Sequence, residues 1–175
     1  AQIAASGGNG AVVLTAGDSV IQNANVSAQG AGRVDVTATA GSITMAGGAT
    51  TTTQNADVTY AAANSIAVGA ISTNTPGGNV RLTAQSGAVT DANVGALNIT
   101  TNMLTASAAT GIGAVADALD TTVTTLAAST SGTGPIAVNE TNGVTLINVI
   151  AANGPIAVTA GGTINAHKVV SSTDA

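Results

Sequence analysis

A five-residue segment returns unchanged after one interval, and that interval limits the folds open to this chain. Residues 134–138 (Gly-Pro-Ile-Ala-Val) recur twenty positions later as residues 154–158. Short β-branched runs lie between the copies, separated by the turn dipeptides Asn142-Gly143 and Asn153-Gly154. A period of this length, holding up to three short strands, predicts a chain that coils and stacks on itself.

The composition favours short stacked strands over other classes of protein. Charged residues make up 6% of the chain, against about 25% in an ordinary globular domain. Disordered chains are poor in the β-branched residues that are frequent here, and the apolar runs are far shorter than the roughly 18 to 20 residues of a membrane span. The net charge is -5, with three basic residues, so we expect neither nucleic acid nor an anionic membrane as partner. The chain has no Cys, which excludes disulfides and thiolate sites.

A shared template sets the predicted register. Residues 32–44 and 78–90 both read Gly, any residue, Val, any residue, Val or Leu, Thr, Ala, then a second Gly-led strand. The hydrophobic residue that opens each copy should form one internal column: Val12, Val34, Val58, Val80, Leu97, Ile136 and Ile156. The long gap between Leu97 and Ile136 is interpreted as two turns, with residues 112–126 supplying the missing one. About eight turns, at ~4.8 Å each, give a stack of roughly 35 to 40 Å.

Strand alternation predicts which side chains face the solvent. Val34 and Val36 should point inward and Asp35 outward, because successive side chains alternate across a strand. The charged residues Arg33, Asp57 and Arg81 then also fall on outward positions. Gly and Asn are expected at the corners, where positive φ angles are needed.

Three stretches fit the template less well. Residues 47–55 should form a loop or a polar strand that bulges from the second turn, and residues 111–120 either a short helical turn or a plain strand. Residues 167–175 should form a frayed tail. Because no shift in composition marks a second domain, we expect residues 1–175 to be a single solenoid domain. Its first residues lack the basic-then-apolar pattern of a secretory signal.

The template at residues 78–90 resembles the repeats of filamentous-haemagglutinin-type adhesins, which are giant secreted bacterial proteins. Further similar segments occur at residues 97–104, 111–113, 119–120, 125–127, 136–140 and 143–144. The resemblance spans about residues 8–166 and implies a right-handed parallel β-helix that serves as an extracellular shaft. The secretion domain of that family has no counterpart here, so export through a partner pore is implied only for a longer parent protein.

Few residues suggest chemistry. His167 is the only histidine, so any Ser-His-Asp triad must use it, but its place beside Lys168 in the expected tail favours a solvated side chain. Asp117 and Asp120, with Thr121, could hold Ca²⁺ if residues 111–120 were helical, although such sites need six or more oxygens. Solvated carboxylates are the preferred interpretation.

Three carboxylates and two Thr-rich runs are further candidates for a functional site. Asp35, Asp57 and Asp91 invite comparison with β-helix polysaccharide lyases and hydrolases, which need clustered carboxylates and sugar-gripping groups. The runs at residues 50–53 and 121–125 would form an ice-binding or other flat polar face only if Thr recurred at one outward position in turn after turn. The template copies align Arg81, Asp35 and Ala there instead, so the Thr residues are interpreted as strand-forming filler.

These observations predict an all-β, right-handed parallel β-helix of about eight coils without an enzyme activity, catalytic residues, a metal or a cofactor. The predicted function is a structural shaft segment of a secreted adhesin on the bacterial cell surface. Its partners would be neighbouring coils of the same or an identical chain, and a cell-surface or glycan ligand reached through a parent protein. The alternative is an extracellular filament subunit that stacks head to tail through uncapped ends.

Overall fold

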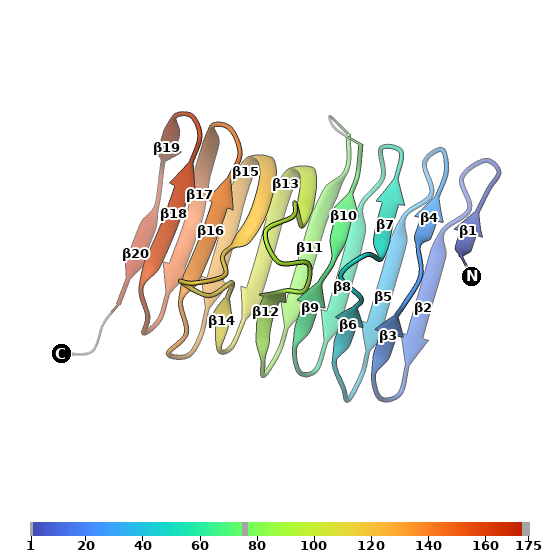
Figure 1. Ribbon diagram of the computed structural model, residues 1–175, viewed down its shortest axis with the longest axis horizontal. Helices are drawn as coiled ribbons and strands as arrows, with labels where there is room; N and C mark the ends of the chain where they lie inside the picture. The colour runs from blue at the N-terminus through green and yellow to red at the C-terminus, as the bar shows by residue number, and fades with distance from the viewer. Residues whose placement is uncertain (1, 75–76, 173–175) are drawn as a thin grey trace.

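The computed structural model describes residues 2–74 and 77–172. In these ranges every regular element is a β-strand, and the 20 strands join in one parallel sheet. The sheet winds into a solenoid of about eight turns, and the two ends of the chain lie at its opposite ends (Figure 1). The prediction of an all-β parallel solenoid is therefore confirmed.

Each of the first turns has three strands, which build three faces. Face A contains β2 (Val12–Ala16), β5 (Val34–Ala38), β8 (Val58–Ala62) and β11 (Asn79–Ala84). Face B contains β3 (Val20–Gln22), β6 (Ile43–Met45), β9 (Ile66–Val68), β12 (Ala88–Asp91) and β14 (Gly111–Ile112). Face C contains β1 (Ile3–Ala5), β4 (Val26–Ala28), β7 (Thr50–Thr53) and β10 (Ala70–Ser72).

In the later turns neighbouring faces share one long strand. The strands β13 (Ile99–Ala108) and β15 (Leu119–Thr130) begin on face C and continue along face A. The strands β16 (Ile136–Glu140) and β18 (Ile156–Ala160) begin on face B and end on face C. Face A closes with β17 (Val144–Ala151), β19 (Ile164–Ala166) and β20 (Val169–Ser171).

The predicted internal column is correct in its first four members and wrong in the last three. Val12, Val34, Val58 and Val80 lie in register on face A, and all are buried. The residue after Val80 is Leu104, followed by Leu126, Leu146 and Ala166. Leu97 instead lies 41% exposed in a loop. The sequence was misleading because Leu97 continues the alternation of Ile99 and Thr101, which are inward residues of β13.

The repeated Gly-Pro-Ile-Ala-Val segment belongs to face B, so the last two members of the predicted column were assigned to the wrong face. Ile136 and Ile156 continue the column that starts at Val20 and runs through Ile43, Ile66, Val89 and Ile112. Residues 112–126 do supply the missing turn, because Leu126 occupies the face A column within them. Gly, any residue and a β-branched residue occur on both faces, as in Gly32-Arg33-Val34 on face A and Gly41-Ser42-Ile43 on face B, so this sequence pattern alone cannot separate the two faces.

The three irregular stretches are more regular than expected. Within residues 47–55, β7 pairs in register with β4 and β10 instead of bulging. Residues 111–120 contain no helix: β14 leads to a tight turn in which Ala114 bridges Asp117, and β15 follows. The expected frayed tail is wrong at β20, which pairs with β17, because Val169 continues an inward column above Val149. Residues 173–175 of that tail lie outside the described residues.

Glycine is needed at most corners for close packing, which corrects the expectation of positive φ angles. Among the described glycines, positive φ occurs at Gly8, Gly30, Gly95, Gly111 and Gly113. At Gly134 φ is not positive, but a Cβ atom would collide with the backbone carbonyl oxygen of Thr110 in the turn below. The corners thus require glycine mainly because stacked backbones approach each other there.

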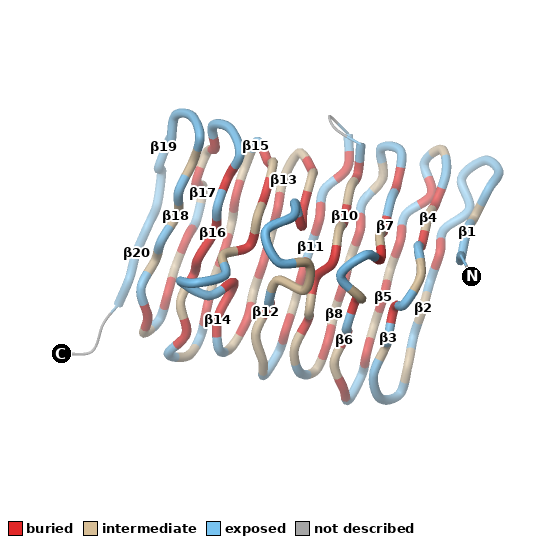
Figure 2. Tube along the Cα trace, in the orientation of Figure 1, coloured by how far each residue is buried: buried red, intermediate tan, exposed pale blue. Residues whose placement is uncertain are grey.

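The core is a set of buried apolar columns, and the charged residues lie outside it. Buried residues line the middle turns, whereas β19 and β20 are exposed (Figure 2). Arg33, Asp57 and Arg81 are exposed and Asp35 is half-buried, so the predicted outward positions are confirmed. Each fully buried Val, Leu or Ile contributes roughly 1.5 to 3 kcal/mol. Since each turn packs on its neighbours, stability is close to a sum of local terms.

Candidate functional site

The residues singled out for Ca²⁺ do not come together. Asp117 is exposed in the turn between β14 and β15, and Asp120 lies on β15, where its Oδ1 accepts a hydrogen bond of 2.7 Å from Asn139 Nδ2. No helix places the two carboxylates on one face. Across the described residues, no group of three or more His, Cys, Asp or Glu side chains is arranged to hold a metal ion.

The other titratable residues are also dispersed. His167 is exposed between β19 and β20, and its backbone N–H donates to the Leu146 carbonyl at 2.9 Å. Asp35 pairs with Arg33 on the surface of β5. Asp57 accepts a hydrogen bond of 2.8 Å from the backbone N–H of Asn79 at a corner. Asp57 lines a hollow together with Arg81, and no second carboxylate and no histidine lines that hollow.

Asp91 lies at the base of the loop between β12 and β13. Its Oδ1 accepts hydrogen bonds of 2.7 Å from the Asn93 backbone N–H and from Asn98 Nδ2. Asp91 Oδ2 and Asn93 Oδ1 are buried with no hydrogen-bond partner among the described residues. At the tip, Val94 is 84% exposed with φ of 48°, a backbone conformation that β-branched residues rarely adopt. This loop is therefore the most strained irregularity found on the solenoid.

The loop belongs to a ridge of corner connections between faces B and C. The connections from β6 to β7, from β12 to β13 and from β14 to β15 lie at this corner (Figure 1). The first two touch, because a Cβ atom on Gly47 would come 2.8 Å from the Ala92 carbonyl oxygen. The tip of the third carries Val115, which is 72% exposed. This corner is where the chain departs most from its repeat.

A polar network crosses the core of the first three turns. The Tyr60 hydroxyl donates to Gln22 Oε1 at 2.6 Å and lies 2.7 Å from the Thr51 hydroxyl. Gln22 Nε2 donates to the Thr51 hydroxyl at 3.0 Å. Tyr60 is fully buried on face A and the other two residues lie on faces B and C, so the network joins all three faces. Burial raises the pKa of Tyr60 to about 12, although the bond to Thr51 acts in the opposite direction.

Glu140 is a buried carboxylate with a structural explanation. Its Oε2 accepts hydrogen bonds from the Thr121 hydroxyl at 2.7 Å and the Val123 backbone N–H at 3.0 Å. The chain turns away after Glu140, so no strand lies above Val123 at this point. The carboxylate takes the place of the missing strand carbonyl as the acceptor for that N–H group.

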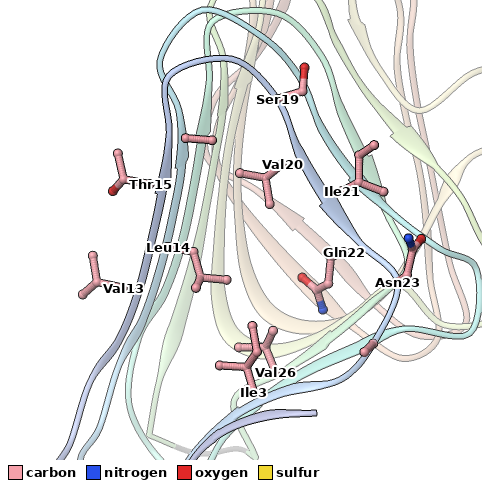
Figure 3. A pocket seen from close by; sticks show the side chains of 12 residues that line it. Ile3, Val13, Leu14, Thr15, Ser19, Val20, Ile21, Gln22, Asn23 and Val26 are labelled. Carbon is pink, nitrogen blue, oxygen red and sulfur yellow. The ribbon is translucent and has the colours of Figure 1, made fainter. Parts of the chain in front are cut away.

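A hollow of about 590 Å³ opens at the N-terminal end of the solenoid. Leu14, Val20 and Val26 point into it, whereas Val13 and Ile21 point away (Figure 3). Leu14 and Val20 occupy inward positions of the first turn, and no other turn among residues 2–74 and 77–172 covers them. We call this apolar hollow the N-terminal pit.

The C-terminal end is open in the same way. Ile164 is 41% exposed and Val169 is 44% exposed, although both lie in columns that are buried in the turns below. Both ends also present strands that pair on one side only, at β2 and β3 and at β18 and β20. Such edges are able to accept a further strand.

No family model matches the chain, and comparisons with curated proteins and with solved structures found no match either. The molecule is a parallel β-solenoid consistent with a β-helix repeat region, and its resemblance to adhesin repeats rests on the sequence template alone. A search of the described residues for helices long and apolar enough to cross a membrane found none.

Sequence reasoning missed the polar network, the Glu140 site and the loop at Asp91. Tyr60 stood out as the only aromatic residue, but its partners lie on other turns, 9 and 38 positions away. Glu140 carried no signal beyond being a charged residue at an inward position of the repeat. Val80 and Leu104 are as far apart in the sequence as Val34 and Val58, so the inserted loop gave no signal in the length of its turn.

Proposed function

We propose that this chain is a non-enzymatic segment of the shaft of a secreted bacterial adhesin, exposed at the cell surface. A shaft needs a rod that can be lengthened by adding turns without changing its cross-section. The observation that carries the proposal is the continuity of the apolar columns from one end of the chain to the other. The column that opens at Val20 closes at Ile156, and the column that opens at Leu14 closes at Val169.

The open ends support the same proposal. Leu14 and Val20 at one end, and Ile164 and Val169 at the other, are core residues that a neighbouring turn would cover. Covering them would bury apolar surface at about 25 cal/mol per Å². The adjoining strand edges would gain backbone hydrogen bonds at the same time. Both ends are thus chemically suited to further turns of the same kind.

The encoding gene tests this proposal directly. A shaft segment predicts that the reading frame continues on both sides with further turns that carry the Gly-x-Val-x-Leu-Thr-Ala template. Start and stop codons immediately beside this segment would contradict it. Turnover of a polysaccharide by the purified chain, lost when a single carboxylate is replaced, would also contradict the non-enzymatic part of the proposal.

A second candidate is a filament subunit that stacks head to tail, and the N-terminal pit favours it. In such a stack Val169 and Ile156 of one copy would cover Leu14 and Val20 of the next, which extends two existing columns. The contact is heterologous and does not close, so it would produce an open-ended fibre.

Electron microscopy of the purified chain separates the two candidates. A filament subunit should form long unbranched fibres, and Leu14→Asp should abolish them because it places a charge in the pit. Val13→Asp is the matched control, since Val13 is 60% exposed and points away from the pit. A monomer at all concentrations, by sedimentation, would contradict the filament candidate.

A further inference from the structure

Face C carries a row of hydroxyl side chains through five successive turns. The strand register aligns them one above another, in the order Ser27, Thr52, Ser72, Thr100 and Thr122. The residues on either side of each, such as Thr51 and Thr53 around Thr52, are buried. Strand alternation therefore points all five hydroxyl groups outward. We call this row the hydroxyl row.

A second polar row runs beside it. Two positions after each of these hydroxyl residues stand four carboxamides and a hydroxyl, in the order Gln29, Gln54, Asn74, Asn102 and Thr124, and the first three lie just beyond the ends of their strands. Gln54 Nε2 donates to Gln29 Oε1 at 3.1 Å, so the first two are in contact across neighbouring turns. We call this row the amide row. The pattern Ser or Thr, any residue, Gln or Asn thus recurs in four consecutive turns.

This arrangement corrects the interpretation of the Thr-rich runs as filler. The residues that spoke against a regular outward face, Asp35, Arg81 and Ala137, lie on faces A and B. On face C an outward hydroxyl does recur in turn after turn. The wrong assignment of the repeated segment to face A concealed this regularity.

Both ends of the paired rows are hollowed. A hollow of about 190 Å³ is lined by Ser27, Gln29, Thr52, Gln54 and Ser72, among others. A second hollow, of about 360 Å³, is lined by the other end of the rows at Thr122 and Thr124, and by Asn142. No charged side chain lines either hollow. Both hollows are therefore polar and uncharged, and the carboxylate on this face near the rows, Asp120, is hydrogen-bonded to Asn139.

The chemistry of the rows defines the partner that they suit. Four of the five turns offer a hydroxyl, which donates and accepts, together with a carboxamide, which does both through separate atoms. Vicinal hydroxyl groups of a sugar present the complementary pair of donors and acceptors. The turns repeat every ~4.8 Å along the hydroxyl row. The lack of basic side chains in the two rows disfavours sulfated or uronic-acid polymers.

We propose that face C binds a neutral, extended polysaccharide whose chain runs along the axis of the solenoid. Each turn contributes one weak and nearly identical subsite, and the sites act together because one polymer engages several of them. An ordered water lattice, as in ice binding, would instead need a flat and rigid array. The two hollows and the long Gln side chains disfavour that partner. The proposal goes beyond the shaft function and can fail while the shaft function holds.

Affinity electrophoresis in native gels tests the proposal. The full chain should be retarded by gels that contain hydroxyethylcellulose, xylan or mannan, and not by gels that contain heparin. The double variant Thr52→Val and Thr100→Val removes two hydroxyl groups and keeps the β-branched shape. The apparent Kd should rise by about tenfold, as expected for two hydrogen bonds of moderate strength.

A matched control keeps the test falsifiable. Thr37→Val with Thr83→Val removes two outward hydroxyl groups from face A, on β5 and β11, and should leave retardation unchanged. Equal melting temperatures for the two double variants would exclude a folding defect. Absence of retardation by every neutral polymer, or equal loss in both variants, would overturn the proposal. Thermal hysteresis of ice growth without glycan binding, lost in the face C variant, would overturn it as well.

Discussion

Replacing Tyr60 by Phe tests whether the core is held across its three faces by hydrogen bonds as well as by apolar contact. The substitution removes one oxygen from a fully buried ring and leaves the ring in place, so no large cavity forms. It removes a 2.6 Å bond to Gln22 Oε1 and a 2.7 Å contact with the Thr51 hydroxyl.

The expected loss of stability follows from the buried polar atoms that Tyr60→Phe leaves unpaired. Gln22 Oε1 keeps only a long 3.4 Å interaction with the Thr51 hydroxyl, while that hydroxyl is still bound by Gln22 Nε2. A buried acceptor that loses its partner costs about 1 to 3 kcal/mol. We expect Tyr60→Phe to lower the free energy of unfolding by that amount, measured by urea denaturation followed by circular dichroism.

Two further variants make the result decisive. Thr59→Val removes an outward hydroxyl beside Tyr60 and should change stability by less than about 0.5 kcal/mol. Adding Gln22→Met and Thr51→Val to Tyr60→Phe should recover part of the loss, because all three members of the network then become apolar. A Tyr60→Phe variant as stable as the parent chain, or a loss unaffected by these two added substitutions, would refute the reasoning.

Three other predictions follow from the same core. Val80→Asp places an unpaired charge in a buried column and should unfold several turns. Asp35→Ser breaks only a surface ion pair and should shift the melting temperature little. Equal melting temperatures for the two variants would contradict the register. Gly134→Ala should destabilise strongly because its Cβ atom meets a backbone carbonyl, whereas Gly48→Ala, with open space around it, should be nearly neutral in thermal melts. The free energy of unfolding should be constant with respect to Tyr60 below pH 10 and fall as the pH rises toward 12, by at most about 1.4 kcal/mol per pH unit. The reason is that the folded state keeps the Tyr60 proton in this range, whereas the unfolded state releases it. Tyr60 is the only aromatic residue, so tyrosinate absorbance would follow its titration alone, and a midpoint near 10 would contradict its burial.

The fold class could be predicted from the sequence because a similar spacing of apolar residues recurs along the chain. Val34, Val58 and Val80 repeat with Asp35 and Arg81 at outward positions, and the structure has this register. Like residues stack on like residues only if successive turns have nearly the same number of residues. The regular spacing in the sequence and the regular burial pattern in the structure therefore have the same cause. This part of the chain left little freedom for another arrangement.

The register failed at the loop before β13 and at the merging of faces B and C after Ile136. The turn with the loop is as long as the turn from Val34 to Val58, so its length does not reveal the loop, whereas the turns after Leu126 are shorter. A strand such as Ile136–Glu140 that is assigned to the wrong face is placed in the wrong column. Its inward and outward residues still alternate correctly, so the alternation does not reveal the mistake. The outward row on face C was hidden for the same reason, since Thr52 and Thr100 align only once the true turns are known.

The most direct test of the stacked-turn account is a set of distances between spin labels along one outward column. Thr15, Thr37, Thr83, Ser107 and Ser129 lie in register on face A, with Ala61 between the second and third, and the chain has no native Cys to interfere with labelling. Cysteines introduced at Thr15 and Ser129, five turns apart, should give a backbone separation of about 24 Å, and those at Thr37 and Ser107, three turns apart, about 14 Å. Distances that do not grow in proportion to the number of turns would contradict the account.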